Sequence, residues 1–286
     1  MGKFGLETRK RFHDGDEIRD KGLTTPLDIE RFDDISYGPL TEQKLDVYRP
    51  KGNDEVLPVI VSVHGGGWVY GDKERYQYYC MSLAQFGFAV VNYTYRLAPE
   101  NLFPSSIEDM VLAFNWVKEN AKEHKLNPDK VFAVGDSAGG AQLGIYANMT
   151  TNPGYAKRFP FKPLIKPIAV ALNCGHYDYS EAKFDDAYLN EFMPVGWGEE
   201  ELDLIDVNKH ITSDFPPAFI MTANKDFLFH DATLIVQALA KKGVFFVYRC
   251  YGTKEKPLEH VFHCNMYLKE AHICNKDETD FFKSFL

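Results

Sequence analysis

The sequence lacks several features on which common classes of protein depend. Its five cysteines are an odd number and form no Cys-x-x-Cys pair, so we expect neither a disulfide framework nor a zinc knuckle. The glycine fingerprint of dinucleotide-binding proteins, Gly-x-Gly-x-x-Gly, is absent. No apolar run is long enough to span a membrane, and no internal repeat occurs. These absences favour an ordinary globular domain that needs no metal or other cofactor.

Positive charge is also in short supply. The chain has 32 Lys and Arg residues against 41 Asp and Glu residues, which gives a net charge of −9. Nucleic acids and anionic membranes both bind to basic surfaces, so we expect neither as a partner. The first twenty residues are charged throughout and lack the apolar core of a signal peptide. We therefore expect a cytoplasmic protein that acts on a small molecule, with a homodimer as a possible assembly.

Short apolar runs recur along the chain and alternate with longer helical patterns. The runs are rich in Val, Ile and aromatic residues, which is typical of strands covered on both faces. They occupy residues 57–63, 88–95, 130–134, 167–172, 218–222 and 244–251. This alternation predicts an α/β fold with a mostly parallel, doubly wound sheet. Residues 35–50 are expected to add an antiparallel hairpin at its edge.

Two segments interrupt the alternation. They are residues 1–34 and approximately residues 175–213, and the second is rich in aromatic and acidic residues. Excursions of this length inside a compact domain are usually functional or form a small subdomain. We expect both to cover the functional site as a cap on a single domain that spans residues 1–286. Surface decoration without a role at the site is the alternative.

The strongest local motif is GDSAGG at residues 135–140, which follows one strand-like run and precedes a helical stretch. It has the form Gly-x-Ser-x-Gly in the strand–turn–helix context of a nucleophile elbow. Small neighbours allow the strand and the helix to approach, and the helix N-terminus favours negative charge beside the Ser137 hydroxyl. Alone, the motif is also compatible with a glycine-rich turn whose serine caps a helix.

A second glycine-rich motif, HGGGW at residues 64–68, directly follows the strand-like run at 57–63. Consecutive glycines can present backbone N–H groups without side chains in the way. Such N–H groups stabilise the negative oxygen of a carbonyl under attack, and losing one costs roughly 2.7–4 kcal/mol. The loop precedes the elbow in the order expected for an oxyanion loop, which favours Ser137 as a nucleophile.

A nucleophilic serine also needs a histidine base that is oriented by a carboxylate. In folds with this type of elbow, the chain order is serine, acid, histidine. Asp226 follows a strand-like run and is the expected acid, whereas the rival Asp231 is expected to cap the next helix. His260 follows the last strand-like run and is the expected base, with His263 in reserve.

Taken together, these motifs make the chain similar to the hormone-sensitive-lipase-like esterases of the α/β-hydrolase fold. The matching segments are HGGGW with GDK, YRLAPE with FP, GDSAGG and PPAFIMTANKD, across about residues 57–262. The resemblance implies an eight-stranded sheet and hydrolysis of carboxylic esters through an acyl-enzyme. It implies a catalytic triad of Ser137, Asp226 and His260. It also implies an oxyanion hole made by the N–H groups of Gly66, Gly67 and Ala138.

The chain departs from this family at two positions. Val261 follows His260 where the family has glycine, and Gln142 stands where the family has asparagine. The HGGGW and GDK segments are also similar to those of bacterial acetyl-xylan and feruloyl esterases and of arylformamidases. Because the expected cap is modest and no lipid-docking segment occurs, short acetyl or aryl esters are the expected substrates. The alternatives are an arylformamidase or amidase with the same triad, and a ligand-binding member of the fold without catalysis.

Aromatic residues near the oxyanion loop and in the second cap segment are candidates for substrate binding. An aromatic side chain at either place could line an acyl or aryl pocket. The candidates are Trp68, Tyr70, Tyr177 and Phe192. For each of them, packing in the core is the competing interpretation.

Overall fold

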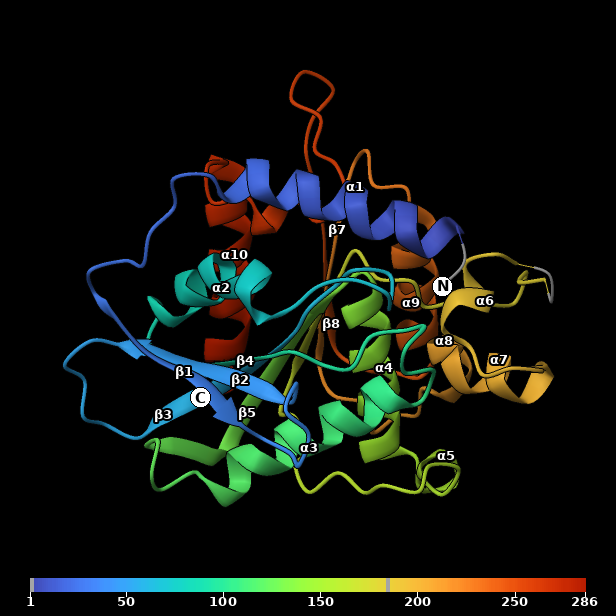
Figure 1. Ribbon diagram of the computed structural model, residues 1–286, viewed down its shortest axis with the longest axis horizontal. Helices are drawn as coiled ribbons and strands as arrows, with labels where there is room; N and C mark the ends of the chain where they lie inside the picture. Colours follow the sequence, from blue (N-terminus) through green and yellow to red (C-terminus); the bar gives the residue numbers. More distant parts are fainter. Residues whose placement is uncertain (1–2, 184–185) are drawn as a thin grey trace.

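The computed structural model of the chain describes residues 3–183 and 186–286. Its centre is an eight-stranded sheet with the order β1-β2-β4-β3-β5-β6-β7-β8 (Figure 1). The strands are β1 (Ile29–Ser36), β2 (Lys44–Pro50), β3 (Leu57–Val63), β4 (Ala89–Tyr93), β5 (Leu126–Asp136), β6 (Val170–Asn173), β7 (Ala218–Ala223) and β8 (Phe246–Tyr251). The pairings of β1 with β2 and of β2 with β4 are antiparallel, and the other five are parallel. The α/β-hydrolase fold expected from the sequence is confirmed.

Helices cover both faces of the sheet. They are α1 (Lys3–Asp20), α2 (Lys73–Ala84), α3 (Ser105–Glu119), α4 (Ala138–Thr151), α5 (Pro153–Ala156), α6 (Leu189–Phe192), α7 (Glu199–Ile205), α8 (Val207–His210), α9 (Phe229–Lys241) and α10 (Lys269–Lys283), with a 3-10 turn at Phe262–Cys264. Side chains of α2 and α10 share one core, and side chains of α3, α4 and α9 share the other. Among the described residues, no helix has the length and apolar character that crossing a bilayer requires.

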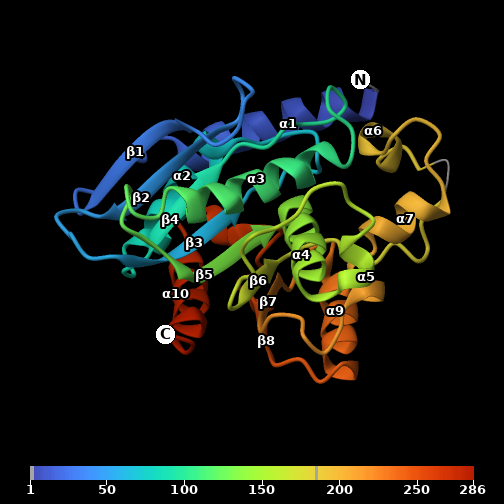
Figure 2. The ribbon, with the colours of Figure 1, turned by 90° about the horizontal axis from the view of Figure 1, so that it is seen from below.

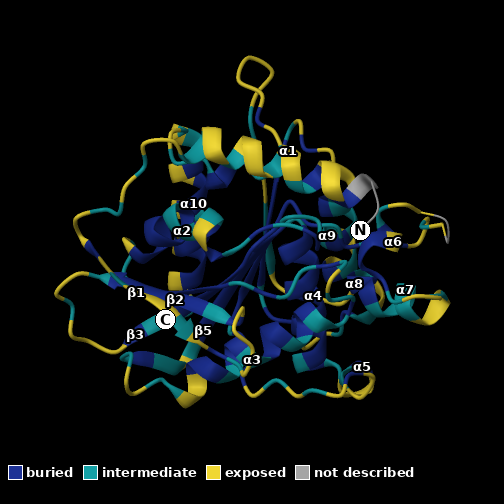
Figure 3. Ribbon diagram, viewed as in Figure 1, coloured by how far each residue is buried: buried dark blue, intermediate teal, exposed yellow. Residues whose placement is uncertain are grey.

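Alternate residues of the central strands face these two cores. In β3, Val59 and Val61 pack on the side of α3 and α4, and Ile60 packs on the side of α2. In β5, Ala133 and Phe132 divide in the same way. Successive side chains of a strand point to opposite faces, so a sheet covered on both sides needs apolar residues at every position. This explains the continuous apolar runs of the sequence and the buried centre in Figure 3.

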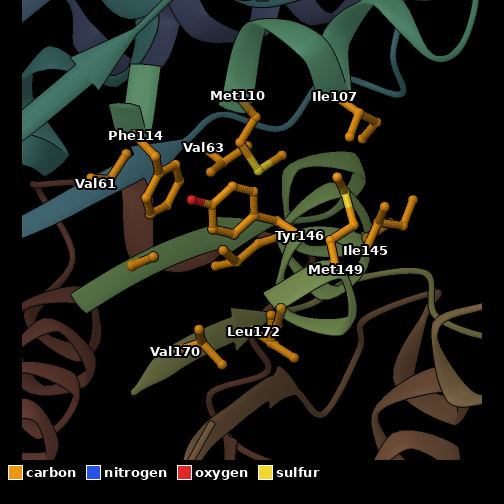
Figure 4. Close-up of a cluster of buried hydrophobic side chains, with 14 of the residues drawn as sticks. Val61, Val63, Ile107, Met110, Phe114, Ile145, Tyr146, Met149, Val170 and Leu172 are labelled. Atoms are coloured by element: carbon orange, nitrogen blue, oxygen red, sulfur yellow. The ribbon is translucent and has the colours of Figure 1, made fainter. Parts of the chain in front are cut away.

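Aromatic and aliphatic side chains fill the core between the sheet and α4 (Figure 4). Tyr146 of α4 is fully buried, and its ring stacks on Phe114 of α3 with 4.1 Å between the centroids. Its hydroxyl donates a hydrogen bond of 2.8 Å to the carbonyl oxygen of Ile165. A large aromatic side chain is thus buried without leaving its polar atom unpaired. This packing fixes α4, whose N-terminus carries the functional site.

The first cap segment is shorter than the sequence predicted. We expected residues 1–34 to form it, but β1 begins at Ile29, so residues 29–34 belong to the sheet. The strand was missed because its sequence, IERFDDIS, buries only Ile29 fully and leaves most of its other side chains exposed, as an edge strand does. Helix α1 is the part of this segment that lies over the end of the sheet (Figure 1).

Helix α1 is held down by polar contacts. The Arg9 guanidinium donates hydrogen bonds of 2.6 Å to the carbonyl oxygen of Val69 and 2.7 Å to that of Ala98. The second cap segment includes the short helices α6, α7 and α8. The two cap segments are in contact where the N–H of Gly5 donates a hydrogen bond of 3.1 Å to Glu191 of α6. Figure 2 shows the start of α1 beside α6.

A close contact between α4 and β3 provides a test of this architecture. A methyl group at Gly139, in the first turn of α4, would lie 2.1 Å from the carbonyl oxygen of Val63 and 2.5 Å from that of His64. We expect Gly139→Ala to lower the free energy of unfolding by at least about 2–3 kcal/mol, because backbone must move to admit it. Urea unfolding at equilibrium measures the change.

Gly15 of α1 supplies the matched control, since a methyl group there would meet nothing within 4 Å. Alanine is the better helix former by about 0.5–1 kcal/mol, so Gly15→Ala should keep or raise the unfolding midpoint. If Gly139→Ala unfolded at the wild-type urea concentration, the described approach of α4 to β3 would be incorrect.

Candidate active site

Ser137 lies at the sharp turn between β5 and α4. Its backbone has φ 51° and ψ −121°, a conformation that a residue with a side chain adopts only under strain. Its N–H donates a hydrogen bond of 2.9 Å to the carbonyl oxygen of Asn173, at the end of the neighbouring strand β6. Backbone strain held by neighbouring strands is typical of a nucleophile elbow, as the sequence predicted.

Three of the predicted side chains form one hydrogen-bonded chain. Nε2 of His260 lies 3.0 Å from Oγ of Ser137, and Nδ1 of His260 lies 2.7 Å from Oδ1 of Asp226. The buried carboxylate of Asp226 also accepts the N–H of Leu228 at 2.9 Å and the hydroxyl of Thr222 at 3.0 Å. The chain therefore has the geometry in which a carboxylate orients a base toward a serine hydroxyl.

The charge state of Asp226 suits that arrangement. Burial by itself would raise the pKa of this carboxyl group. The hydrogen bond and the charge of His260 outweigh burial, so the pKa of Asp226 lies below its ordinary value. Asp226 is therefore ionised at neutral pH, where it can stabilise a positively charged imidazole.

His263 and Asp231, the alternative candidates for the base and the acid, do not join this hydrogen-bonded chain. His263 is fully buried, its ring meets Tyr79 edge-on at 4.9 Å, and burial lowers its pKa to about 3. Asp231 lies inside the first turn of α9, and its carboxylate accepts the N–H groups of Tyr177 at 2.9 Å and Asp178 at 3.3 Å. The prediction that Asp231 caps the helix is wrong, because it holds the second cap segment instead.

Buried side chains fix the loop at residues 64–68. The ring of His64 stacks on Tyr95 at 3.9 Å, and the Tyr95 hydroxyl donates to the carbonyl oxygen of His64 at 3.0 Å. Burial lowers the pKa of His64 to about 4, so the ring is neutral. Its Nδ1 lies 2.8 Å from the carbonyl oxygen of Gly65, and the Gly65 N–H donates to Tyr76 at 2.9 Å.

The glycines that follow leave N–H groups available. Gly66 and Gly67 have φ values of 121° and 62°, and the Gly66 carbonyl accepts the N–H groups of Val69 and Tyr70. Across residues 3–183 and 186–286, no acceptor receives the N–H of Gly66 or of Gly67. Ala138 is the first residue of α4, so its N–H has no acceptor within the helix. These N–H groups are the expected oxyanion donors.

A cavity of about 180 Å³ lies beside Ser137, between the oxyanion loop and α1. Pockets for drug-sized ligands usually enclose about 300–1,000 Å³, so this one is small. Tyr70 lines it as predicted, and its hydroxyl donates to Asp16 of α1 at 3.0 Å. Its lining residues are Arg11, Phe12, Gly15, Asp16, Arg19, Gly65, Gly66, Tyr70, Tyr76, Asp136, Ser137, His260 and Val261.

The other three aromatic candidates do not line this cavity. Trp68 is buried and stacks on Phe192 at 4.7 Å, with 2° between the ring planes. Tyr177 is fully buried, and its hydroxyl accepts the N–H of Gly175 at 3.1 Å. These side chains pack in the core beneath the loop and the second cap segment, and their assignment to substrate binding stays a prediction.

Sequence analysis also missed residues at the site. Arg11, Phe12, Asp16 and Arg19 of α1 line the cavity, although no motif marks them. The sequence signals them only weakly, because the N-terminal segment has no apolar stripe that would direct a helix to another surface. Phe227 is 75% exposed, and its ring lies 4.3 Å from that of His260. Its place directly after the expected acid was the available clue.

Two groups of side chains bring possible metal ligands within 4.8 Å of one another in the part of the chain that the structure describes. One contains Cys174 together with Asp226 and His260, which already bond to each other. The other contains Asp136, His263 and Cys264. An ion at the first group would have to displace the hydrogen bond that orients His260.

Comparisons with known proteins identify the family of the chain. A family model described as the alpha/beta hydrolase fold matches residues 60–263. The chain belongs to this family. It is 32% identical to the carboxylesterase NlhH of Mycobacterium tuberculosis over 223 residues, which cover 73% of this chain and 69% of that protein. It is 27% identical to the versiconal hemiacetal acetate esterase of Dothistroma septosporum, covering 74% of this chain and 69% of that protein.

Solved structures agree on the fold. An esterase of Pyrobaculum calidifontis superimposes with a TM-score of 0.78 at 26% identity, over 98% of this chain and 93% of that one. Esterase B of Lactobacillus rhamnosis, inhibited by a tributyrin phosphonate, superimposes with a TM-score of 0.90 at 22% identity, over 98% and 94% of the two chains. At that identity, the second similarity carries information about the fold alone.

Asp136, the residue before Ser137, has a pKa above the ordinary value for a carboxyl group. It is 2% exposed, and its carboxylate accepts the Tyr76 hydroxyl at 2.8 Å. Burial raises the pKa of Asp136 to about 6, against the opposing effects of the Tyr76 hydrogen bond and the charges of His260 and Arg19. The folded chain therefore holds this proton more tightly than the unfolded chain does.

This difference predicts a pH dependence of stability. Between pH 4 and 6 the unfolded chain has lost the Asp136 proton while the folded chain retains it, so stability falls as pH rises through this window. Relative to Asp136→Asn, the wild-type free energy of unfolding should fall by about 2–3 kcal/mol from pH 4 to pH 7. Urea titrations of both chains measure it, and a difference independent of pH would contradict the assignment.

Proposed function

We propose that the chain hydrolyses short-chain carboxylic esters, acetyl or aryl, through an acyl-enzyme on Ser137. The observation that carries the proposal is the unbroken hydrogen-bonded chain from Asp226 through His260 to Ser137, with distances of 2.7 and 3.0 Å. The printed names of similar proteins, carboxylesterase and acetate esterase, support the same reaction class. Membership of the alpha/beta hydrolase family supports the same order of nucleophile, acid and base.

The first half of the reaction forms the acyl-enzyme. Nε2 of His260 accepts the hydroxyl proton of Ser137 as its Oγ bonds to the ester carbonyl carbon. The carbonyl oxygen becomes negatively charged, and Asp226 stabilises the imidazolium that has formed. When the tetrahedral intermediate collapses, the bond to the alcohol oxygen breaks and His260 gives its proton to the departing alcohol.

The second half releases the acid. His260 takes a proton from a water molecule, whose oxygen attacks the acyl carbon. The new tetrahedral intermediate collapses, the bond to Oγ breaks, and His260 returns a proton to Ser137. In both halves, the N–H groups of Gly66, Gly67 and Ala138 are the proposed donors to the negatively charged oxygen.

The preference for short acyl groups rests on the size of the site. The cavity beside Ser137 encloses about 180 Å³, and α1 closes one side of it with Phe12 and Asp16. A long acyl chain would have to displace α1, whose Arg9 is bonded to the carbonyl oxygens of Val69 and Ala98. We therefore assign acetyl and similarly short esters to the site.

The cellular setting is part of the proposal. We assign the chain to the cytoplasm, because its five cysteines are free and the cytosol keeps thiols reduced. The homodimer suggested from the sequence stays a prediction, as does the absence of nucleic-acid and membrane partners.

A substrate panel tests the reaction class. We expect kcat/KM to be highest for p-nitrophenyl acetate or butyrate and at least about tenfold lower for the octanoate, because the extra methylene groups do not fit the described cavity. N-formylkynurenine is the matched formamide substrate. Cleavage of the formamide alone would replace the ester proposal with an arylformamidase, and cleavage of neither class would favour a ligand-binding protein.

A second experiment tests the proposed acid. Asp226→Asn should lower kcat by about 10⁴-fold, because the amide favours the wrong tautomer of His260 while its geometry is kept. Asp231→Asn is the matched control, since Asp231 binds the N–H groups of Tyr177 and Asp178 and does not contact His260. It should leave kcat within about threefold of the wild type. Equal losses in the two variants would argue against Asp226 as the acid.

A further inference from the structure

Tyr76 and Asp136 form a buried pair beneath the oxyanion loop, and the proposed reaction steps do not use them. Tyr76 comes from α2 and is 7% exposed, and Asp136 ends β5 and is 2% exposed. The Tyr76 hydroxyl donates to Oδ2 of Asp136 at 2.8 Å and accepts the N–H of Gly65 at 2.9 Å. The hydroxyl therefore joins the elbow strand to the loop.

The pair constrains the peptide group that precedes the proposed donors. Gly65 is followed directly by Gly66 and Gly67. A methyl group at Gly65 would lie 2.6 Å from Oδ2 of Asp136 and 2.8 Å from the Tyr76 hydroxyl, so the loop rests on the pair without spare room. The pair therefore holds the residue that directly precedes the two proposed donors.

An ionised carboxylate gives the hydroxyl a single useful orientation. A phenol has one proton to donate and lone pairs to accept, and an ionised carboxylate can accept hydrogen bonds but not donate them. The Tyr76 proton must then point at Asp136, which leaves a lone pair of the same oxygen for the Gly65 N–H. A protonated Asp136 could donate to Tyr76 and release this constraint.

The surroundings of Asp136 include both charges that favour ionisation and groups that oppose it. Arg19 of α1 and His260 stabilise the carboxylate, and Asp16 of α1 opposes it. Other titratable groups that interact with Asp136 include Tyr76 and Cys80 of α2, Tyr95 after β4, Cys174 after β6, Cys264 in the 3-10 turn and Glu278 of α10.

We propose that Tyr76, oriented by ionised Asp136, is a positioning residue that aims the N–H groups of Gly66 and Gly67 at the developing oxyanion. The inference rests on the proposed function, because it assigns these residues to the same reaction. Tyr76 lines the cavity beside Ser137, but its hydroxyl is engaged by Asp136 and the Gly65 N–H, so it acts on the reaction through the Gly65 peptide. Its effect should therefore appear in the transition state and leave ground-state binding largely unchanged.

Tyr76→Phe tests the proposal, because it removes the hydroxyl and keeps the ring. We expect kcat for p-nitrophenyl acetate to fall roughly 10- to 100-fold, while KM changes less than about threefold. Tyr79→Phe is the matched control. Tyr79 lies on the same helix, and its buried hydroxyl donates to Glu278 at 2.9 Å without contacting the loop. The control should lose a similar amount of thermal stability and keep kcat within about threefold.

A double-mutant cycle tests the dependence on Asp136. If Asp136 acts through the Tyr76 hydroxyl, Asp136→Asn should lower kcat in the wild type and should lower it little further in Tyr76→Phe. Additive losses would mean that the two residues act separately. Equal losses of kcat in Tyr76→Phe and Tyr79→Phe, or a rise in KM at constant kcat, would also overturn the proposal.

Labelling of Ser137 by a fluorophosphonate separates this proposal from the proposed function. The phosphonylation transition state also places negative charge on an oxygen, so it needs the same N–H donors. The labelling rate should be at least about tenfold lower in Tyr76→Phe and unchanged in Tyr79→Phe. A wild-type chain that is labelled at Ser137 but cleaves no ester would refute the esterase proposal, and the labelling rates would still decide the role of Tyr76.

Discussion

The site depends on the close approach of the first turn of α4 to the end of β3. Gly139 has no side chain, so the helix can sit against the carbonyl oxygens of Val63 and His64. This contact places the helix N-terminus, with Ser137 before it, beside the loop that follows β3. The backbones of Ser137, Gly66 and Gly67 all have positive φ values where these two chain segments lie together.

The sequence predicted the parts of the site that follow from local motifs on strand ends. Parallel strands place their carboxyl ends at one edge, so Ser137, Asp226 and His260 were expected to meet, and in the structure they share hydrogen bonds. Their catalytic roles remain a proposal. The YRLAPE segment, one of the motifs of the resemblance, contributes Tyr95, whose ring stacks on His64. Each of these predictions depends on a motif of a few consecutive residues at the end of a strand.

The positions of the aromatic side chains and of helix α1 depended on packing between segments that are distant in the sequence. An aromatic side chain beside a loop can line a pocket or fill the core, and Trp68 fills the core because Phe192 stacks on it. Helix α1 reached the site through polar contacts such as that between Tyr70 and Asp16, which no periodicity reveals. Its outward side chains Leu6 and Ile18 are 57% and 78% exposed, so hydrophobic patterning gave no indication of its position.

The central claim is that Ser137 carries the acyl group between the two halves of the reaction. Rapid mixing with p-nitrophenyl acetate, followed by acid quenching and intact-mass measurement, tests it most directly. We predict a burst of nitrophenol and an added acetyl mass that peptide mapping places on Ser137, both absent from Ser137→Ala. Ester hydrolysis that persists in Ser137→Ala, or an acetyl group found on another residue, would contradict the account.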